Sequence, residues 1–597
     1  MIFKYLLLML VSSVAYCRDV DESDSCAFGT YDYIVVGSGS AGSVVVNRLT
    51  SDENITVLLL EAGGYPTFHS EIPFLAAAQH LTEQNWGYHM ERQPNFALGL
   101  NNELMPWPRG KVLGGSSVIN SMLYVRGNKE DYDRWAAGGN PGWSYDEVLP
   151  YFKKSEYASL KRMDSEYHGI HGLLNVQDVP YRTKSAKLIV NGFQDMGYRY
   201  VDYNGKDQMG VSYVQATQRD GRRCSAEKAF IRPAEFRPNL KICLHRRVSK
   251  VLLNENKEAY GVQYIDSNNT EHKVYATREV ILSAGTFHSP QILMLSGIGP
   301  KDHLSDLNIP LVQNLPVGEK LFDHLAFIGL VFTVEKPIII DFSQSMAPTS
   351  LFNFLVNGRG VLTLPLGVEA FAYYKTSAAN YSENYPDIEF MFTSGSLHTD
   401  HNLFFKNTFG VTATVYEALW KDLESKYAWS ISPILFHPKS HGSVKLRSKD
   451  PLDPPLLYGN YLSDPENYDL RALIDAIREV QRVTKGSRFE KLGTEQVRTP
   501  VPGCEQIPYD SDPYWECAIR HIPSTMNHQT STCKMGPKSD TEAVVDHKLR
   551  VHGVKNLRVI DTSIIPVTLS GHTNAVAFMI GEKSADLILD DYYISRQ

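Results

Sequence analysis

The feature that most constrains the fold is the hexapeptide GSGSAG at residues 37–42, which follows the apolar run YIVV at 33–36. Gly37, Gly39 and Gly42 stand in G-x-G-x-x-G register. In such a turn the first glycine allows a tight bend, the second lets the backbone approach a pyrophosphate, and the third lets helix and strand pack closely. The motif alone is weak evidence, because a simple loop can carry the same residues.

The residues that follow make the motif specific. Residues 41–49 have a helical pattern, and VLLL at 57–60 indicates a second buried strand. Glu61 ends that strand, where an acid is expected to hold ribose hydroxyls. This order predicts a right-handed βαβ unit that binds a dinucleotide. Because an acid would repel a 2′-phosphate, NAD and FAD are favoured over NADP.

The chain of 597 residues is long enough for more than one domain. EVIL at 279–282 and NLRVI at 556–560 indicate further strands, and DIEFMF at 387–392 lies in a region rich in aromatic residues, prolines and short β-like runs. We therefore expect an α/β fold in which a discontinuous Rossmann-like domain is combined with an antiparallel sheet and helices. The expected parts are a nucleotide-binding domain at 30–310 with inserted pieces of the second domain, a mainly substrate-binding domain at 311–525, and a return to the first domain at 526–592.

The first 17 residues have the layout of a secretory signal peptide. Lys4 precedes the apolar run 5–11, small residues follow, and Arg18 begins a charged stretch. The apolar run is too short to span a bilayer. We expect cleavage near Cys17 and a secreted, extracellular protein without membrane attachment.

Cysteines and sequons suit that compartment. Cys504 and Cys517 flank a polar stretch that indicates a surface loop, and we predict a disulfide between them. No two cysteines have CxxC spacing, so no metal site is predicted. The N-x-[ST] triplets at Asn54, Asn268 and Asn380 are candidate glycosylation sites.

Four segments resemble the glucose–methanol–choline (GMC) oxidoreductase family. RGKVLGGSSVINSMLYVRGNKEDYD at 109–133 is similar to its first signature and GTFHSPQILMLSGIG at 285–299 to its second. Residues 524–536 and 560–586 are similar to its histidine-bearing active-site segments. The likeness runs from about 30 to 590. It implies FAD, and it is greatest to the secreted insect branch, which includes glucose dehydrogenases and oxidases of salicyl alcohol and hydroxygeraniol.

The resemblance also implies where FAD is held. It places Asn120 near the isoalloxazine, Val248 against the adenine through its backbone, and Asp561 near the ribityl or pyrophosphate part. Covalent members carry histidine just before the asparagine, where this chain has Ile119, so we predict non-covalent FAD. The predicted contacts are Gly37, Gly39, Ser40, Ala41, Gly42, Glu61, Arg109, Val112, Gly115, Ser116, Asn120, Val248, Ala284, Asp561, Asn574 and Ala575.

Of the 19 histidines, His528 and His572 are the candidate catalytic residues. Alcohol oxidation removes a hydroxyl proton and a hydride, and histidine suits a base that works near neutral pH. By the resemblance, His572 precedes a helix whose N-terminus faces the flavin, and His528 lies on the other wall of the site. We predict His528 as the base and His572 as its hydrogen-bonding partner. The reverse assignment stays open, because neighbouring imidazoles titrate together.

The chain departs from the family pattern at two places. Gln529 begins QTSTC where the family often has Pro-x-Gly-Thr-Cys, and Lys320 stands in VGEKLFDH at 317–324 where asparagine is usual. We therefore expect a differently shaped substrate pocket and one altered local contact.

These features predict an FAD-dependent alcohol oxidase or dehydrogenase that uses oxygen or a quinone-like acceptor. The aromatic-rich second domain favours a small apolar or aromatic primary alcohol. A glucose-type sugar dehydrogenase with another acceptor stays open, as does a redox-inactive lyase or binding paralogue. The net charge of -8 and the lack of a basic run argue against nucleic acid as a partner. The sequence does not indicate the oligomeric state.

Overall fold

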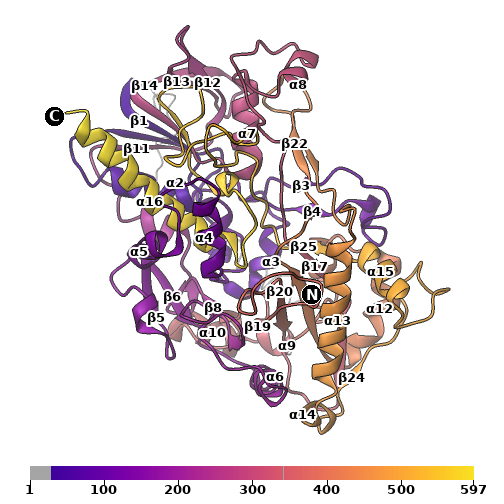
Figure 1. Cartoon of the computed structure of the whole chain (residues 1–597). Helices are drawn as coiled ribbons and strands as arrows, with labels where there is room; N and C mark the ends of the chain where they lie inside the picture. Colours follow the sequence, from indigo (N-terminus) through magenta and orange to yellow (C-terminus); the bar gives the residue numbers. More distant parts are fainter. Residues whose placement is uncertain (1–28, 341, 597) are drawn as a thin grey trace.

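Two β-sheets of different character organise the protein, one in the upper and one in the lower part of Figure 1. The computed structural model describes residues 29–340 and 342–596, so the predicted signal peptide lies outside the described residues. The combination of a Rossmann-like sheet with an antiparallel sheet and helices confirms the predicted fold class. The domain boundaries at 310 and 525 stay a prediction.

The first sheet has seven strands in the order β11-β2-β1-β14-β13-β12, with β26 paired to β14. The pairs β11–β2, β2–β1, β1–β14 and β14–β26 are parallel, whereas β12–β13 and β13–β14 are antiparallel. The sheet thus joins segments from the start, middle and end of the chain. Its strands are β1 (Thr30–Val36), β2 (Val57–Leu60), β11 (Leu240–Cys243), β12 (Arg247–Leu253), β13 (Ala259–Ile265), β14 (Glu271–Leu282) and β26 (Leu557–Val559).

The second sheet has eight strands, and its ladders are antiparallel. The main path runs β24-β18-β21-β20-β19-β7, while β17 pairs with both β21 and β25. Strand β7 comes from the middle of the expected nucleotide-binding domain, so a piece of that segment serves the second sheet. The strands are β7 (Val211–Tyr213), β17 (Leu325–Phe327), β18 (Val331–Val334), β19 (Val368–Tyr374), β20 (Ile388–Thr393), β21 (Tyr427–Leu435), β24 (Glu495–Gln496) and β25 (Pro523–Thr525).

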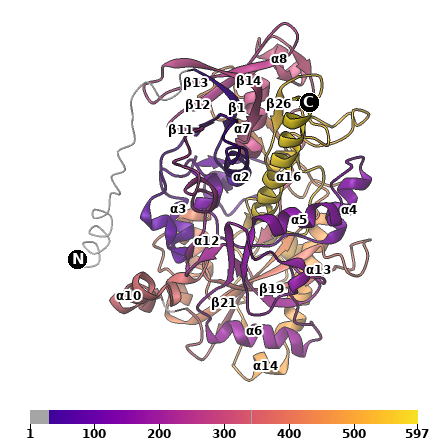
Figure 2. The same ribbon diagram turned by 90° about the vertical axis from the view of Figure 1, so that its left-hand side faces the viewer.

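Helices cover both sheets. The C-terminal helix α16 (Thr573–Ile594) packs along α2 (Ser40–Leu49), as the second view shows (Figure 2). A Cβ on Gly581 would lie 2.7 Å from the Ala41 carbonyl oxygen, so only glycine permits this approach. The other longer helices are α4 (Lys129–Ala137), α5 (Tyr145–Ser155), α6 (Lys184–Asp195), α7 (Gly285–Leu295), α10 (Pro348–Asn357), α13 (Tyr468–Thr484) and α15 (Asp512–His521).

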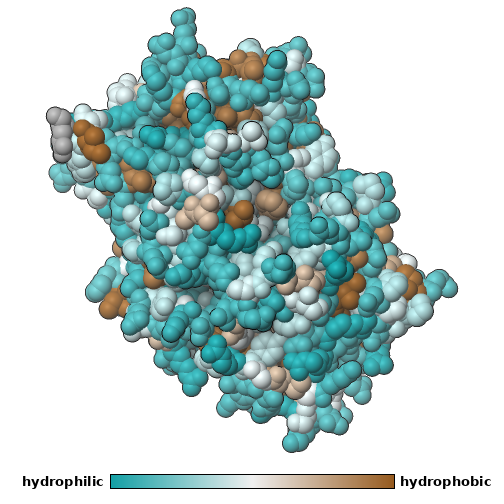
Figure 3. All heavy atoms as spheres, in the orientation of Figure 1, coloured by the Kyte–Doolittle hydropathy of each residue, from teal (hydrophilic) through white to brown (hydrophobic). Residues whose placement is uncertain are grey.

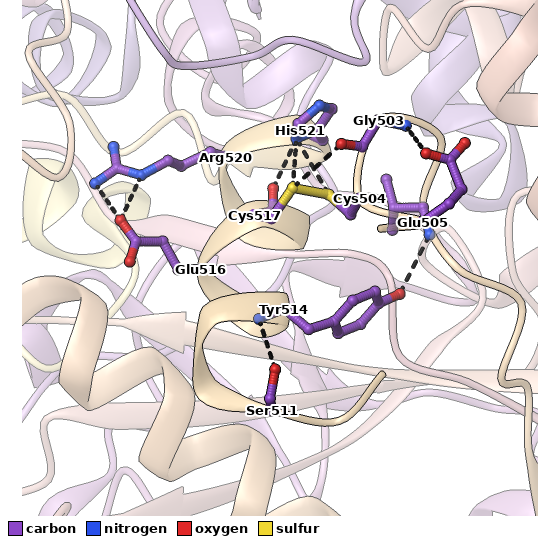
Figure 4. Close-up of a disulfide and its surroundings, with 10 residues drawn as sticks. Gly503, Cys504, Glu505, Ser511, Tyr514, Glu516, Cys517, Arg520 and His521 are labelled. Atoms are coloured by element: carbon purple, nitrogen blue, oxygen red, sulfur yellow. Dashed lines mark hydrogen bonds and ion pairs between the residues drawn. A yellow bond between two sulfur atoms is a disulfide. The ribbon is translucent and has the colours of Figure 1, made fainter. Parts of the chain in front are cut away.

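The predicted disulfide between Cys504 and Cys517 is present, with Cα atoms 5.9 Å apart (Figure 4). The expected surface loop is only partly correct, because residues 512–521 form α15 and place Cys517 on a helix. His521 Nδ1 lies 3.5 Å and 3.6 Å from the two sulfur atoms. Cys504, Cys517 and His521 are grouped as metal ligands would be, but disulfide sulfurs are not thiolates and do not bind a metal in that way.

The face drawn in Figure 3 is mainly hydrophilic, with small separate hydrophobic groups. Within residues 29–340 and 342–596, no helix is both long and apolar enough to span a bilayer.

Candidate active site

A cavity of about 370 Å³ is lined by residues of both sheets. On one side its wall begins where β1, β2, β14 and β26 end, the edge at which parallel α/β sheets bind ligands. Of the predicted site residues, Gly42, Val112 and Ala575 lie outside the lining, in the packed layer behind it. The cavity is lined by the others: Gly37, Gly39, Ser40, Ala41, Glu61, Arg109, Gly115, Ser116, Asn120, Val248, Ala284, Asp561, Asn574, His528 and His572.

The glycine turn after β1 is built for close backbone packing. Gly37 has φ +95°, and a Cβ there would lie 2.5 Å from the Ser283 carbonyl oxygen. A Cβ on Gly42 would lie 2.2 Å from the Gly37 oxygen, so Gly42 lets α2 pack against the turn. By contrast, a Cβ on Gly39 or Gly285 would meet nothing closer than 4.0 Å. These two glycines therefore leave open space in the cavity for a ligand to approach the backbone.

Two helices begin at this cavity. Ser40 and Asn574 lie in the first turns of α2 and α16, and Ser40 Oγ is 2.5 Å from Asn574 Oδ1. The N-terminus of a helix presents free N–H groups and the positive end of its dipole. The cavity is therefore suited to a group that carries negative charge, such as a pyrophosphate or a reduced flavin.

Glu61 connects the glycine turn after β1 to the turn at Gly114. Its carboxylate accepts hydrogen bonds from Ser38 N at 3.0 Å, Ser38 Oγ at 2.6 Å and Gly63 N at 2.8 Å. Ser38 Oγ in turn accepts from Gly114 N at 3.1 Å. Burial raises the pKa of Glu61, and these donors oppose that rise. The acid thus fixes the position of the loop in which a ribose is expected.

Asp561 has a similar place at the end of β26. Its carboxylate accepts from Ser289 Oγ at 2.6 Å, Gly285 N at 2.9 Å and Ser563 N at 2.8 Å. Burial raises its pKa. It therefore holds the start of α7 against the cavity.

The two candidate catalytic histidines lie side by side, with ring centroids 4.7 Å apart. Two residues absent from the predicted set engage them. His572 Nε2 donates to Glu389 Oε1 at 3.1 Å, and His528 Nδ1 lies 3.0 Å from His324 Nδ1. The sequence held a weak signal for each, since Glu389 is an acid inside an otherwise apolar strand and His324 ends the segment VGEKLFDH.

Electrostatics keep His528 neutral. Its pKa lies well below the usual value because of burial and the neighbouring His572, His324 and Arg109. Burial, together with His572, lowers the pKa of His324 to about 3. The accessible part of His528 faces the cavity. A neutral imidazole facing a cavity is able to accept a proton there.

Asp323 holds the turn that carries His528. Its buried carboxylate accepts from the His528 backbone N at 2.9 Å, Thr525 Oγ1 at 2.5 Å, Tyr461 OH at 2.6 Å and Gln529 Nε2 at 2.9 Å. Burial raises the pKa of Asp323 to about 6. Gln529, one of the departures from the family pattern, thus donates to the same acid. Three of the four donors belong to the turn itself, and Tyr461 holds the acid from another segment.

The other departure, Lys320, forms an ion pair with Glu542 at 2.5 Å. Both side chains are partly exposed, so the pair adds little stability. It ties residues 317–324 to the C-terminal part of the chain.

Arg109 brings unsatisfied donors to the cavity. Its Nη1 donates to the Asn527 carbonyl at 3.1 Å, and its guanidinium lies 4.7 Å from the centre of the Phe287 ring. Nε and Nη2 are buried and have no partner within the described chain. Burial lowers the pKa of Arg109 to about 10, so it is cationic at neutral pH. Such donors fit a cofactor with carbonyl or phosphate oxygens.

The residues present therefore fit FAD. One cavity is surrounded by two open glycines, two helix N-termini, a buried arginine and two acids that accept hydrogen bonds from neighbouring groups. A histidine pair also faces this cavity. These are groups that suit a dinucleotide with a redox-active ring beside a proton acceptor.

Comparisons with known proteins agree with this arrangement. Residues 31–326 and 438–581 match the N-terminal and C-terminal sequence profiles of GMC oxidoreductases. The chain is 39% identical to glucose dehydrogenase (FAD, quinone) of Drosophila melanogaster, over 98% of this chain and 92% of that protein. It is 36% identical to alcohol dehydrogenase (acceptor) of Pseudomonas putida, over 94% of this chain and 96% of that protein.

A solved structure extends the likeness to three dimensions. A formate oxidase variant of Aspergillus oryzae, studied for modification of its FAD, is 25% identical and superposes with a TM-score of 0.81. The match covers 95% of this chain and 99% of that chain. The resemblance seen in the sequence is confirmed: the chain belongs to the GMC oxidoreductase family and is an FAD-dependent oxidoreductase that acts on CH–OH groups.

Proposed function

We propose that this protein oxidises a small, uncharged primary alcohol with an apolar or aromatic body to the aldehyde, and that His528 is the general base. The observation that carries the proposal is the His528–His572 pair, which lines a cavity whose lining residues on the second sheet carry no charged side chain. In this proposal the other predicted site residues that line the cavity hold FAD, while Gly42, Val112 and Ala575 pack behind them.

The lining residues on the second sheet are here termed the second-sheet wall. Its members are Ala326, Val368, Met391, Thr393, Ser430, Ser432, Ser524 and Thr525. The lining residues with a full charge are elsewhere, namely Glu61, Arg109, Arg246, Arg247 and Asp561. Burying a charged substrate against an uncharged wall would be costly. The wall therefore favours a neutral alcohol over a cation such as choline.

The base assignment follows from the two nitrogens of His528. Its Nδ1 is engaged by His324, which leaves Nε2 as the nitrogen open to the cavity. For this role we assign the proton between the two Nδ1 atoms to His528. His324 Nδ1 is then the acceptor, His528 Nδ1–H the donor, and His528 Nε2 carries the lone pair. That nitrogen takes the hydroxyl proton of the substrate.

His572 plays the complementary part. Its bond to Glu389 fixes the ring orientation and stabilises positive charge on the imidazole. The ring binds the substrate oxygen and stabilises its alkoxide character as the proton leaves. FAD held here would supply the hydride acceptor, and the N-terminus of α16 would favour the negative charge that results.

A glucose-type sugar dehydrogenase is the second candidate. The Drosophila relative bears that name, and the second-sheet wall carries the hydroxyls of Thr393 and Ser432. These groups are able to bond to a polyol.

Secretion belongs to the same proposal. The signal-like N-terminus supports it, and Asn54, Asn268 and Asn380 lie exposed, as glycosylation requires. Truncation of residues 1–17 would keep the protein inside the producing cell if this is correct.

The deciding experiment is anaerobic bleaching of bound FAD by a panel of benzyl-type and aliphatic primary alcohols, glucose and choline. We expect the apolar primary alcohols to bleach the flavin fastest. Faster bleaching by glucose would establish the second candidate, and no bleaching by any alcohol would leave a lyase or a binding protein. Reoxidation by oxygen and by a quinone then separates an oxidase from a dehydrogenase.

A further inference from the structure

A second buried arginine lies directly behind the cavity wall. Arg223, on β10 (Arg222–Arg223), is only 2% exposed. Its Nε donates to the Ser70 carbonyl at 2.6 Å, and Nη1 donates to the Ser117 carbonyl at 3.0 Å and to Asn120 Oδ1 at 2.8 Å. All three acceptors are neutral.

No acid of the described chain pairs with this guanidinium. Its Nη2 is buried without a partner there, and burial alone lowers its pKa, to about 9. Arg223 is therefore a buried cation at neutral pH. Leaving such a charge uncompensated is costly for the folded protein, which calls for a functional explanation.

Arg223 also determines which way the Asn120 amide faces. Asn120 Oδ1 accepts from Arg223 Nη1 and from Met122 N, the latter at 3.0 Å. Both neighbours are donors, so only the amide oxygen can face them. The amide nitrogen is turned the other way, and Asn120 lines the cavity. The wall thus presents a hydrogen-bond donor with a cation behind it.

We propose that Arg223 is a positioning residue that fixes the Asn120 amide and places a buried positive charge behind the flavin, so that the pair stabilises the reduced, negatively charged cofactor. The inference rests on the proposed placement of the flavin beside Asn120, and not on which alcohol is the substrate. A preorganised donor and a cation in a low-dielectric site act strongly on charge that develops there. They therefore raise the midpoint potential of bound FAD.

Three variants test this. Arg223→Met removes the charge and the bond to Asn120, while Arg223→Lys keeps the charge. Asn120→Asp keeps the side-chain shape, but its carboxylate pairs with Arg223 and cancels both the charge and the donor. The matched control is Arg222→Met, because Arg222 is the neighbour on β10 and donates instead to the Leu355 carbonyl at 2.8 Å.

The readouts are FAD content and the midpoint potential measured against a reference dye. For Arg223→Met and Asn120→Asp we expect the reduced form of FAD to be disfavoured at least tenfold. For a two-electron couple, this lowers the midpoint potential by about 30 mV. The midpoint potential should fall less in Arg223→Lys than in Arg223→Met. In Arg222→Met it should equal that of the unmodified protein. If Arg223→Met fails to fold, Asn120→Asp decides.

Variants that hold FAD at the unmodified potential would overturn the inference and leave the proposed function intact. An Arg223→Lys potential as low as that of Arg223→Met would contradict the role of charge. Failure of the unmodified protein to bind FAD would instead overturn the flavin placement on which the inference rests.

Discussion

His572 Nε2 lies 3.1 Å from Oε1 of Glu389, a fully buried acid near the start of β20. The bond joins the segment before α16 to the second sheet across 183 residues of sequence. It therefore holds one wall of the active site against the other, and it gives His572 a defined orientation and a partner for positive charge.

Glu389→Gln is expected to keep FAD bound and to slow its reduction by alcohol about 10- to 100-fold. The neutral amide loses a charge-assisted bond of about 1.5–3 kcal/mol. Single-turnover reduction without oxygen measures the effect. Glu369→Gln is the matched control, because Glu369 is buried on β19 and accepts from Thr183 N at 2.7 Å instead of a site histidine. Equal rates for the two variants would contradict the role of Glu389.

The depressed pKa of His528 predicts a particular pH profile. A base works only when it is unprotonated. The reaction rate therefore decreases when the pH is lowered through the pKa of the base. Burial, His572, His324 and Arg109 put that pKa well below 6.5. The rate of flavin reduction should therefore stay nearly constant from about pH 8 to pH 6. The lower end of this range is below the ordinary pKa of histidine. A clear loss of rate centred near pH 6.5 would count against His528 as the base.

FAD is expected to be released when the protein is precipitated with acid. Ile119 stands where covalent members carry a histidine, and it has no nitrogen to attach to the flavin. The yellow colour should appear in the supernatant, where its absorbance is read. Colour that stays with the polypeptide would reveal a covalent link through another residue.

The disulfide is expected to stabilise α15 and the segment that leads to His528. Replacing both Cys504 and Cys517 by serine should lower the free energy of unfolding by about 2–4 kcal/mol. Denaturant unfolding measures the change, and the unmodified protein under the same oxidising conditions serves as the control, because Cys243 is also disulfide-bonded and reduction would break that bond too. An unchanged midpoint would show that the bridge adds no stability.

Local sequence was enough for the βαβ unit of the first sheet and the glycine turn that lines the cavity, but β11, β12 and β13 were not predicted. The turn at Gly37 and the acid at Glu61 lie within one βαβ unit, so short-range spacing determines their arrangement. Helix α15 was missed because the polar stretch 505–516 that indicated a loop covers only its first half, whereas the buried Ala518 and Ile519 lie beyond it. The signal was present, since Ser511 Oγ accepts from Tyr514 N at 3.3 Å as an N-cap and Pro513 occupies the first turn.

The partners of the two histidines could not be placed from sequence. Glu389 meets His572 only when the second sheet docks on the first, and His324 meets His528 only when β17 pairs with β25 within the second sheet. Nothing local distinguishes Glu389 from Glu369, another buried acid on the neighbouring strand. Long-range packing supplies that information.

The most direct test of the central claim is anaerobic stopped-flow reduction of FAD in the His528→Ala variant. The account predicts full FAD content and reduction by alcohol about 10²–10⁴-fold slower than in the unmodified protein, the usual contribution of a positioned base. A His572→Ala variant should also be slow, and the double variant should lose less than the product of the two effects. A His528→Ala variant that keeps its FAD and reduces it at the unmodified rate would contradict the assignment of His528 as the base.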